Sequence, residues 1–369
     1  MKLLYITNGI IGAGGLERVL AIKASYLADE FGYDVYILTL NQGSQEPFYR
    51  FSNKITFLNI AVGGNPAQYF LQYKNGIQSA VDAVNPDVIS VCDDGLKGFF
   101  LPLILGKRCP IIYERHVSKL IAIGQNPGFV KKIKTSVQFG LMDVLAKKFD
   151  RFVVLTDQNL LEWNLDNTAV ISNPLSFYPE ESSALNQKRV IAVGKQGYQK
   201  GFDLLLHSWH EVRKEFPDWT LNIYGKFEKA QNLDAIKEKL QLGSAVIFHP
   251  PEKDIEKRYL ESSLYVMSSR FEGFGMVLIE AMACGVPCVS FNCPYGPSDV
   301  IADGTDGLLA KNGDVSDLAA KLMLLMKNDA LRIDMGKKAK QNVQRYLPDL
   351  IVKQWDGLFN ELVKEHKKR

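Results

Sequence analysis

The stretch Ser268-Ser-Arg-Phe-Glu-Gly-Phe-Gly-Met-Val-Leu-Ile-Glu280, continued by Ala-Met-Ala-Cys-Gly-Val-Pro-Cys-Val-Ser290, places two carboxylates eight positions apart. Gly273 and Gly275 interrupt regular structure after Glu272, and an apolar, helix-forming run then leads through Glu280. The pattern predicts a loop and then a helix that begins near Gly275. Such a helix start presents backbone N–H groups to an anion. One carboxylate on each side of that site suits a phosphate flanked by two polyols, as in a sugar nucleotide. The plainer alternative is a buried helix with one exposed acidic turn.

Length and composition indicate a globular protein of two domains. The chain has 369 residues, of which 46% are hydrophobic and 23% are charged, and this length exceeds one ordinary core. The net charge of +3 gives no electrostatic argument for a nucleic acid partner. The five cysteines lack the spacing of a zinc site, so we predict reduced thiols. No run reaches the roughly 18 apolar residues of a membrane span. The N-terminus turns to glycine too early for a signal peptide, and we expect a cytoplasmic protein.

Short apolar runs alternate with helical patterns along both halves of the chain. Expected strands cover residues 3–7, 35–40, 55–60, 88–92, 111–114, 152–155, 169–171, 189–193, 220–224, 246–249, 264–267, 288–291 and 308–310. Expected helices cover residues 16–31, 68–84, 202–216, 255–261, 275–284, 298–302, 315–327, 331–346 and 349–364. This order predicts an α/β fold with mostly parallel sheets. Residues 176–188 are polar and unpatterned, and we interpret them as a linker between domains 1–180 and 181–346.

Each half opens with a strand, a glycine-rich loop and a helix, an arrangement that holds phosphate groups. The first loop carries Gly12, Gly14 and Gly15, whose spacing differs from the dinucleotide fingerprint and disfavours a nicotinamide site. The second loop carries Lys195 and Lys200. These two cations either neutralise a phosphate or are simply solvated.

Polar residues follow two expected strands of the first half. Glu114-Arg-His116 ends one strand, and ligand groups gather at such ends in open α/β sheets, although a lone histidine is as often structural. Asp93-Asp94 follows another strand and resembles a metal-binding pair. Adjacent acids at a strand end more often form a turn or cap a helix. We therefore predict no catalytic metal and no cofactor.

Residues 126–148 are basic and amphipathic. Phe129, Ile133 and Val137 recur at helical spacing, with lysines at positions 131, 132 and 134 around them. Two interpretations are open. The helix lies on an anionic bilayer, or it is an ordinary surface helix whose apolar stripe faces its own domain.

Together these motifs resemble those of the retaining glycosyltransferases of family four, the glycosyl transferases group 1, which have the GT-B fold. The resemblance rests on the stretch around Glu272 and Glu280, on Gly194-Lys-Gln-Gly-Tyr-Gln-Lys-Gly201, and on Gly14-Gly-Leu-Glu-Arg-Val19. It implies two Rossmann-like domains that face a central cleft. It also implies that residues from 347 onward form a helix that crosses back to the N-terminal domain.

The resemblance assigns the donor-binding roles in the second half. Glu272 would hold hydroxyls of the donor sugar, and Glu280 would hold the ribose hydroxyls. Lys195 and Lys200 would neutralise the diphosphate together with the backbone of Gly273, Phe274 and Gly275. Lysine at position 195 replaces the family's more usual arginine, which removes a planar two-pronged contact but keeps the charge.

In the first half, the resemblance places His116, with Arg115 beside it, against the donor sugar. Gly14 and Gly15 would approach the donor diphosphate and the acceptor. Glu272, Lys200 and His116 are thus the expected catalytic residues.

The implied activity is sugar transfer from a nucleotide-sugar donor to a glycan or lipid-linked acceptor in bacterial cell-surface polysaccharide biosynthesis, without a metal. UDP is favoured by family habit, and contact with the inner membrane face is expected for a lipid-linked acceptor. Two other classes use the same fold. A nucleotide-sugar epimerase would turn over donor without acceptor, and a sugar-nucleotide-binding protein would show no turnover.

Overall fold

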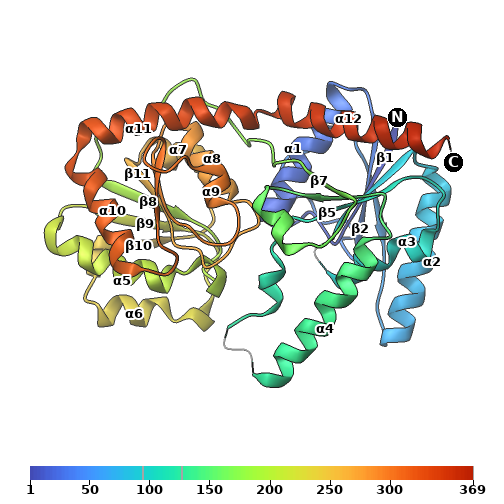
Figure 1. Cartoon of the computed structure of the whole chain (residues 1–369), viewed down its shortest axis with the longest axis horizontal. Coiled ribbons are helices and arrows are strands. Elements are labelled where there is room, and N and C mark those ends of the chain that lie inside the picture. The colour runs from blue at the N-terminus through green and yellow to red at the C-terminus, as the bar shows by residue number, and fades with distance from the viewer. Residues whose placement is uncertain (94, 126–127, 369) are drawn as a thin grey trace. The chain divides into compact units, whose positions relative to one another are not determined.

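The computed structural model describes residues 1–93, 95–125 and 128–368, which form two compact units (Figure 1). The first unit holds residues 1–117 and 128–176 together with the C-terminal stretch from Pro348. The second unit runs from Phe177 to Leu347. Residues 118–125 also belong to the second unit, which the predicted boundary at 180 did not anticipate.

The first unit is built on a parallel sheet of seven strands in the order β3-β2-β1-β4-β5-β6-β7. The strands are β1 (Lys2–Thr7), β2 (Asp34–Leu40), β3 (Thr56–Ile60), β4 (Val88–Cys92), β5 (Ile111–Glu114), β6 (Arg151–Val154) and β7 (Thr168–Val170). The helices are α1 (Gly15–Asp29), α2 (Pro66–Val84), α3 (Leu101–Leu105), α4 (Phe129–Ala146) and α12 (Pro348–His366). Two 3₁₀ turns, η1 (Leu96–Phe100) and η3 (Gln158–Glu162), complete this unit.

The second unit is built on a parallel sheet of six strands in the order β10-β9-β8-β11-β12-β13. The strands are β8 (Arg189–Val193), β9 (Thr220–Tyr224), β10 (Val246–His249), β11 (Leu264–Met267), β12 (Cys288–Phe291) and β13 (Gly307–Ala310). The helices are α5 (Phe202–Glu215), α6 (Leu233–Lys239), α7 (Ile255–Leu260), α8 (Met276–Ala283), α9 (Pro297–Val300), α10 (Val315–Lys327) and α11 (Asp329–Asn342). Its 3₁₀ turns are η2 (Lys119–Ala122), η4 (Tyr198–Lys200), η5 (Lys229–Gln231), η6 (Gly243–Ala245) and η7 (Val343–Tyr346).

In each sheet the strand order reverses at a central strand. In the first unit β1 pairs with both β2 and β4, and in the second unit β8 pairs with both β9 and β11. In open parallel sheets, ligands bind outside the carboxyl ends of the strands at such a switch point. The loops after β1 and β4, and those after β8 and β11, are therefore the places to look for a site.

The central strands are buried on both faces, which explains why they are continuous apolar runs in the sequence. All residues of β4 and β5 are buried, as are those of β11 and β12. Each unit has its own hydrophobic cluster, with Phe99 and Phe152 in the first and Trp209 and Phe291 in the second. Every predicted strand is present, with each end within one residue of its predicted position.

The C-terminal helix α12 completes the first unit, as predicted for residues from 347 onward. It packs along α1 (Figure 1) and buries Trp355 and Phe359. The Tyr33 hydroxyl donates to Asp356 Oδ1 at 2.6 Å, and Arg151 bonds Glu361 Oε1 at 2.7 Å. Burial of the hydroxyl and, to a smaller extent, the carboxylate of Asp356 raise the pKa of Tyr33.

Within the described ranges, each helix is too short or too polar to span a lipid bilayer. Asp93 forms the predicted turn, because its Oδ1 accepts hydrogen bonds from Gly95 N at 2.7 Å and Asn8 Nδ2 at 2.8 Å. Its neighbour Asp94 lies outside the described residues, as do positions 126 and 127 of the predicted basic helix.

Candidate active site

The switch point of the second unit brings two predicted loops together. β8 and β11 pair in parallel, with Val190 opposite Leu264 and Ile191 opposite Tyr265, so their carboxyl ends lie at the same edge. The loop after β8 carries the two predicted lysines, and the loop after β11 carries Glu272. Loops far apart in the sequence therefore meet at one edge of the sheet.

Lys200 and Glu272 form an ion pair at this edge. Lys200 Nζ lies 2.7 Å from Glu272 Oε1, and the two side chains are only 18% and 7% exposed. The same oxygen accepts a hydrogen bond from Ser269 Oγ at 2.6 Å, while Gln199 Nε2 lies 3.4 Å from Oε2. Because water is largely excluded, these contacts fix the carboxylate more firmly than a surface pair would.

The two loops are also bonded to each other around Arg270. Its guanidinium holds Asp203 through two bonds of 2.9 and 2.6 Å, and its backbone N–H donates to Gln199 O at 2.8 Å. The two loops lie too close at Gly201 for a side chain, because a Cβ there would stand 2.1 Å from the backbone oxygen of Ser268. The position of Lys200 relative to Glu272 is therefore set by the backbone as well as by the ion pair.

Helix α8 begins directly after Glu272 and the two predicted glycines. Gly275 is its N-cap, with φ of +91°, and no side chain of the described residues caps this end. Phe274 turns inward, is 2% exposed and meets the Tyr346 ring at 5.4 Å. Because Phe274 turns inward and Gly273 has no side chain, the start of α8 presents backbone N–H groups. Such a helix start suits an anion.

Two other predicted donor residues have partners of their own. Lys195 Nζ lies 2.5 Å from Glu228 Oε1, with the lysine side chain 62% exposed. Glu280 is 1% exposed, and its Oε2 accepts a hydrogen bond of 3.4 Å from the Tyr259 hydroxyl on α7. The structure thus brings Lys200 and Glu272 together, whereas Lys195 and Glu280 each face a different neighbour.

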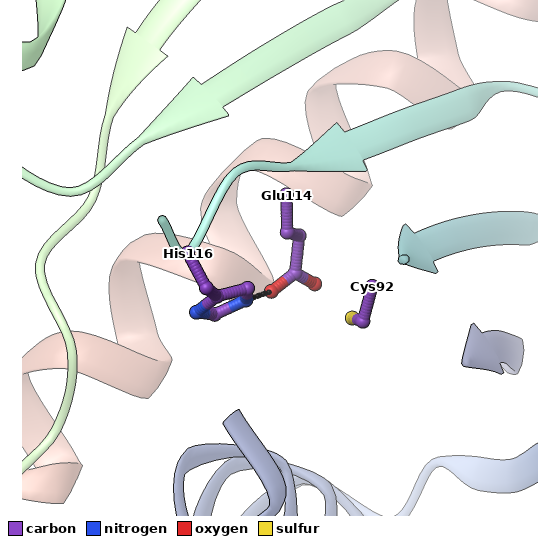
Figure 2. A group of neighbouring side chains, drawn as sticks. All are labelled: Cys92, Glu114 and His116. Carbon is purple, nitrogen blue, oxygen red and sulfur yellow. Dashed lines mark hydrogen bonds and ion pairs between the residues drawn. The ribbon is translucent and has the colours of Figure 1, made fainter. Parts of the chain in front are cut away.

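The predicted site residues of the first unit surround Glu114, the last residue of β5. Its Oε2 accepts from Lys23 Nζ and lies 3.2 Å from His116 Nε2, and its Oε1 accepts from Ser90 Oγ at 2.5 Å. Figure 2 shows the His116 ring turned back onto this carboxylate. Lys23 and Glu114 are each 1% exposed, so the ion pair lies in the interior.

Burial and neighbouring charge shift the pKa of Glu114 in opposite directions. Burial alone would raise the pKa of this carboxyl, but attraction to Lys23 and the hydrogen bond from His116 outweigh it and hold the pKa at about 2. Two aromatic rings lie against the ammonium, since Lys23 Nζ is 3.9 Å from the Trp355 ring centroid and 5.1 Å from that of Tyr5. Glu114 is therefore a buried anion that orients His116.

Cys92, Glu114 and His116 offer one ligand atom each within 4.8 Å of one another, which is the geometry of a metal site (Figure 2). The surroundings fit a cation poorly. Both oxygens of Glu114 already bond other groups, and one of them is paired with the ammonium of Lys23. A divalent ion would repel that ammonium at close range. We assign these residues to the ion-pair network instead.

The second ring nitrogen of His116, Nδ1, does not take part in this network. Its side chain is 5% exposed, and Nδ1 has no hydrogen-bond partner among the described residues. Arg115 beside it is also buried, with its guanidinium carbon 5.8 Å from the Trp163 ring centroid. A buried ring nitrogen without a partner is the kind of group that a ligand hydroxyl satisfies.

The first glycine-rich loop holds a carboxylate that sequence reasoning did not place. A Cβ on Gly12 would lie 2.3 Å from Glu17 Oε1, and one on Gly14 would lie 2.4 Å from Oε2. Glu17 therefore folds back over the loop, with Gly14 as the N-cap and Gly15 as the first residue of α1. These glycines make room for Glu17, in addition to any room that they leave for a ligand.

The family model described as glycosyl transferases group 1 matches residues 177–342. Over 371 aligned residues the chain is 32% identical to the amylovoran biosynthesis glycosyltransferase AmsD of Erwinia amylovora, which covers 97% of this chain and 99% of that protein. The chain belongs to the group 1 glycosyltransferases. It is therefore an enzyme of the transferase class, as the motifs predicted.

Solved structures similar to this group 1 glycosyltransferase confirm the GT-B fold. A sucrose-phosphate synthase from Thermosynechococcus elongatus aligns with a TM-score of 0.85 at 17% identity, over 99% of both chains. Anabaena HepE in complex with UDP and glucose aligns with a TM-score of 0.79 at 18% identity, over 98% of this chain and 100% of that one. The family match includes the loops of Lys200 and Glu272, whereas His116 lies outside it.

Proposed function

We propose that this glycosyltransferase moves a sugar, with retention of anomeric configuration, from a UDP-sugar to a glycan or lipid-linked acceptor in cell-surface polysaccharide biosynthesis, at the cytoplasmic face of a membrane. The observation that carries the proposal is the sheltered Lys200–Glu272 pair at the switch point of the second sheet. AmsD is named for amylovoran biosynthesis, and the HepE structure holds UDP and glucose. Both support the polymer setting and the choice of UDP.

Sugar transfer requires that charge be stabilised as the sugar–phosphate bond breaks. An ammonium has three donors, and Lys200 gives one of them to Glu272, which leaves two for a diphosphate oxygen. Glu272 accepts from Lys200, Ser269 and Gln199, so its orientation is fixed before a sugar hydroxyl arrives. In many enzymes, preorganised donors of this kind make the largest contribution to the rate enhancement, and each raises kcat on the order of a hundredfold or more.

The proposed step is a same-face displacement. The bond between the anomeric carbon and the diphosphate oxygen breaks, and its electron pair leaves with the UDP. The acceptor oxygen forms the new bond to the anomeric carbon on the same face, and its proton passes to the departing phosphate oxygen. Glu272 remains a hydrogen-bond acceptor throughout and forms no covalent adduct. A glycosyl-enzyme adduct trapped on Glu272 and detected by mass spectrometry would refute this route.

The remaining predicted residues have supporting roles in the proposal. Lys195, whose side chain is exposed, would exchange its partner Glu228 for a phosphate oxygen. Gly14, Gly15 and the start of α8 would offer backbone N–H groups. The lysines take the place that a metal has in other transferases, so the proposed reaction requires neither metal nor cofactor.

The proposal also includes contacts from the first unit to the donor sugar and from Glu280 to the nucleoside. His116 Nδ1 would bond a donor-sugar hydroxyl, with Arg115 beside it, and Glu280 would bond the ribose. Glu280 is 1% exposed, so this last contact requires α8 or α7 to shift on binding.

A thermal-shift experiment tests the donor assignment. The protein is melted with UDP-, GDP- and ADP-sugars, with and without EDTA, beside Lys200→Ala and the control Lys239→Ala, which removes an exposed lysine of α6. A ligand that binds only the native state raises the melting temperature by mass action. We expect a shift with UDP-sugars alone that is unaffected by EDTA, reduced in Lys200→Ala and kept in Lys239→Ala. A shift that EDTA abolishes would contradict the metal-free proposal.

Turnover separates transfer from the two other functions of this fold. Incubation with UDP-sugar alone should leave the donor intact, apart from slow hydrolysis. Conversion to a second nucleotide sugar would indicate an epimerase, and tight donor binding without transfer to any acceptor would indicate a binding protein. The anomeric configuration of the product, read from its proton coupling by NMR, tests retention.

A further inference from the structure

Helix α4 carries a row of apolar side chains that its own unit does not bury. Their exposed fractions are large: Phe129 78%, Val130 65%, Ile133 50%, Val137 67%, Leu141 38% and Val144 60%. Elsewhere in the unit, exposed large apolar residues such as Leu103 and Leu161 do not form such a row along one helix. Single exposed apolar residues need no explanation, but a contiguous row indicates an interaction surface.

The row forms one face of the helix. At about 100° per residue, the six side chains fall within a sector of about 120°. The buried residues of α4 lie on the other side, and these are Thr135, Met142, Leu145 and Ala146. The helix is thus attached to its unit by one apolar face and presents a second one outward. In Figure 1 its N-terminal end points away from the sheet of the unit.

This arrangement excludes one of the two interpretations of the sequence pattern. The stripe of Phe129, Ile133 and Val137 does not pack on its own domain, because these side chains are at least half exposed. The core contacts of α4 come from residues that the sequence pattern had not singled out. An ordinary surface helix is therefore the wrong interpretation for this stripe.

Charge indicates what covers the stripe. Residues 129–148 contain five lysines, at positions 131, 132, 134, 147 and 148, against the single acid Asp143. Residues 129–134 at the N-terminal end of α4 are all exposed, and they carry three of these lysines beside Phe129, Val130 and Ile133. Apolar side chains flanked by lysines on one exposed helix are the features of a helix that lies in the interface of an anionic bilayer.

We infer that α4 is a membrane-docking surface for anionic lipid. The side chains from Phe129 to Val144 enter the boundary between headgroups and acyl chains, and the lysines lie among the headgroups. An 18-residue helix is about 27 Å long, long enough to hold the unit on the bilayer without crossing it. The inference rests on the α4 surface itself and not on donor chemistry. If the proposed function also holds, docking would bring the enzyme to lipid-linked acceptors.

Vesicle co-sedimentation of the full chain tests the inference. The vesicles are phosphatidylcholine with and without phosphatidylglycerol. One variant is Phe129→Ser with Ile133→Ser and Val137→Ser, a second is Lys131→Gln with Lys132→Gln and Lys134→Gln, and the control is Leu103→Ser with Leu161→Ser. The control removes exposed apolar residues of the same unit, at 60% and 81% exposure, outside α4.

We expect binding to the anionic vesicles that the control retains. The apolar variant should lose at least roughly a hundredfold in partition coefficient, since each side chain that leaves the interface costs about tenfold. The lysine variant should also lose about a hundredfold, at about fivefold per charge. Salt should weaken wild-type binding, because the Debye length falls from about 10 Å at 0.1 M to about 3 Å at 1 M.

Three outcomes would overturn the inference. They are absence of vesicle binding, equal binding to neutral vesicles, and a concentration-dependent dimer in sedimentation velocity that the apolar variant disperses while vesicles remain unbound. The variants should keep the wild-type melting temperature because the substituted side chains are exposed. Their response to UDP-sugar should also be unchanged. A wild type that binds vesicles but no sugar nucleotide would refute the proposed function and leave the docking surface in place.

Discussion

Replacing Lys23 with methionine tests the role of the buried ion pair in the first unit. Methionine keeps most of the side-chain volume and the contact with Trp355 but removes the charge that faces Glu114. The carboxylate is then left 1% exposed, with Ser90 and His116 as its only remaining partners among the contacts described above. Breaking a buried pair by removing one partner destabilises a protein by about 3–5 kcal/mol.

The pKa of Glu114 gives an independent magnitude. A fall from 4.5 to about 2 on folding corresponds to about 3 kcal/mol of stability at neutral pH, at about 1.4 kcal/mol per pKa unit. Because the folded pKa is depressed, this stability is present above pH 4.5 and is lost as the pH falls towards 2. Without Lys23, burial dominates and the pKa of Glu114 should rise above its unfolded value. The variant should then gain stability as the pH falls from neutral towards 4.5, a range in which the contribution of Glu114 to wild-type stability is constant.

Hydrogen exchange measured by mass spectrometry reads this effect within the first unit. Exchange from peptides that cover β4 and β5 should accelerate by a factor on the order of 10²–10³ in Lys23→Met at neutral pH. The control is Lys338→Met on α11, which removes a 2.7 Å pair with Asp334 whose side chains are about half exposed. Such a pair contributes only about 0.3–0.5 kcal/mol.

The reasoning would be refuted if Lys23→Met exchanged like the wild type at neutral pH. It would also fail if the variant and the wild type lost stability in parallel as the pH fell. Either result would mean that Glu114 is not held as an anion by Lys23.

Three further predictions concern the second unit and the C-terminal helix. Glu272→Gln should lower kcat by a factor on the order of 10² or more while UDP binding, measured by calorimetry, changes little; an unchanged kcat would remove Glu272 from the transition state. Gly201→Ala should abolish donor binding, because its Cβ would clash with Ser268 O. The control Gly243→Ala has a similar positive φ of +49° but lies in open space, so it should cost only about 1–2 kcal/mol of stability. Equal effects of the two substitutions would mean that backbone strain alone explains the loss. Trp355→Ala should destabilise the first unit by about 3–5 kcal/mol in the same exchange assay, and a change below 1 kcal/mol would exclude α12 from its core.

Hydrophobic periodicity and the positions of glycine and small polar residues are sufficient to predict the strands and the site loops. β8 and β11 are short apolar runs that end at glycines or small polar residues, and their parallel pairing makes the loops at Lys200 and Glu272 neighbours. Helix α6 was missed, because seven residues with few apolar positions give too weak a helical pattern.

Side-chain pairing across long sequence distances was beyond sequence reasoning. The bonds from Lys23 to Glu114 and from Lys195 to Glu228 depend on loop and helix placement that no local pattern encodes. Helix α4 shows a further limit. It has two apolar faces, and periodicity alone cannot tell which of them packs inward.

The attachment of α12 to the first unit has a consequence for synthesis on the ribosome. Trp355 covers the ammonium of Lys23 from a position 332 residues later in the chain. The second unit, from Phe177 to Leu347, is therefore translated in full before the first can acquire its last helix. Domains usually fold in the order in which they emerge. Until α12 is synthesised, the apolar surface that it covers on α1 stays exposed in the nascent first unit, and the second unit can finish folding first. A chaperone that binds exposed apolar surface should therefore associate with ribosome-bound chains until the C-terminus is released.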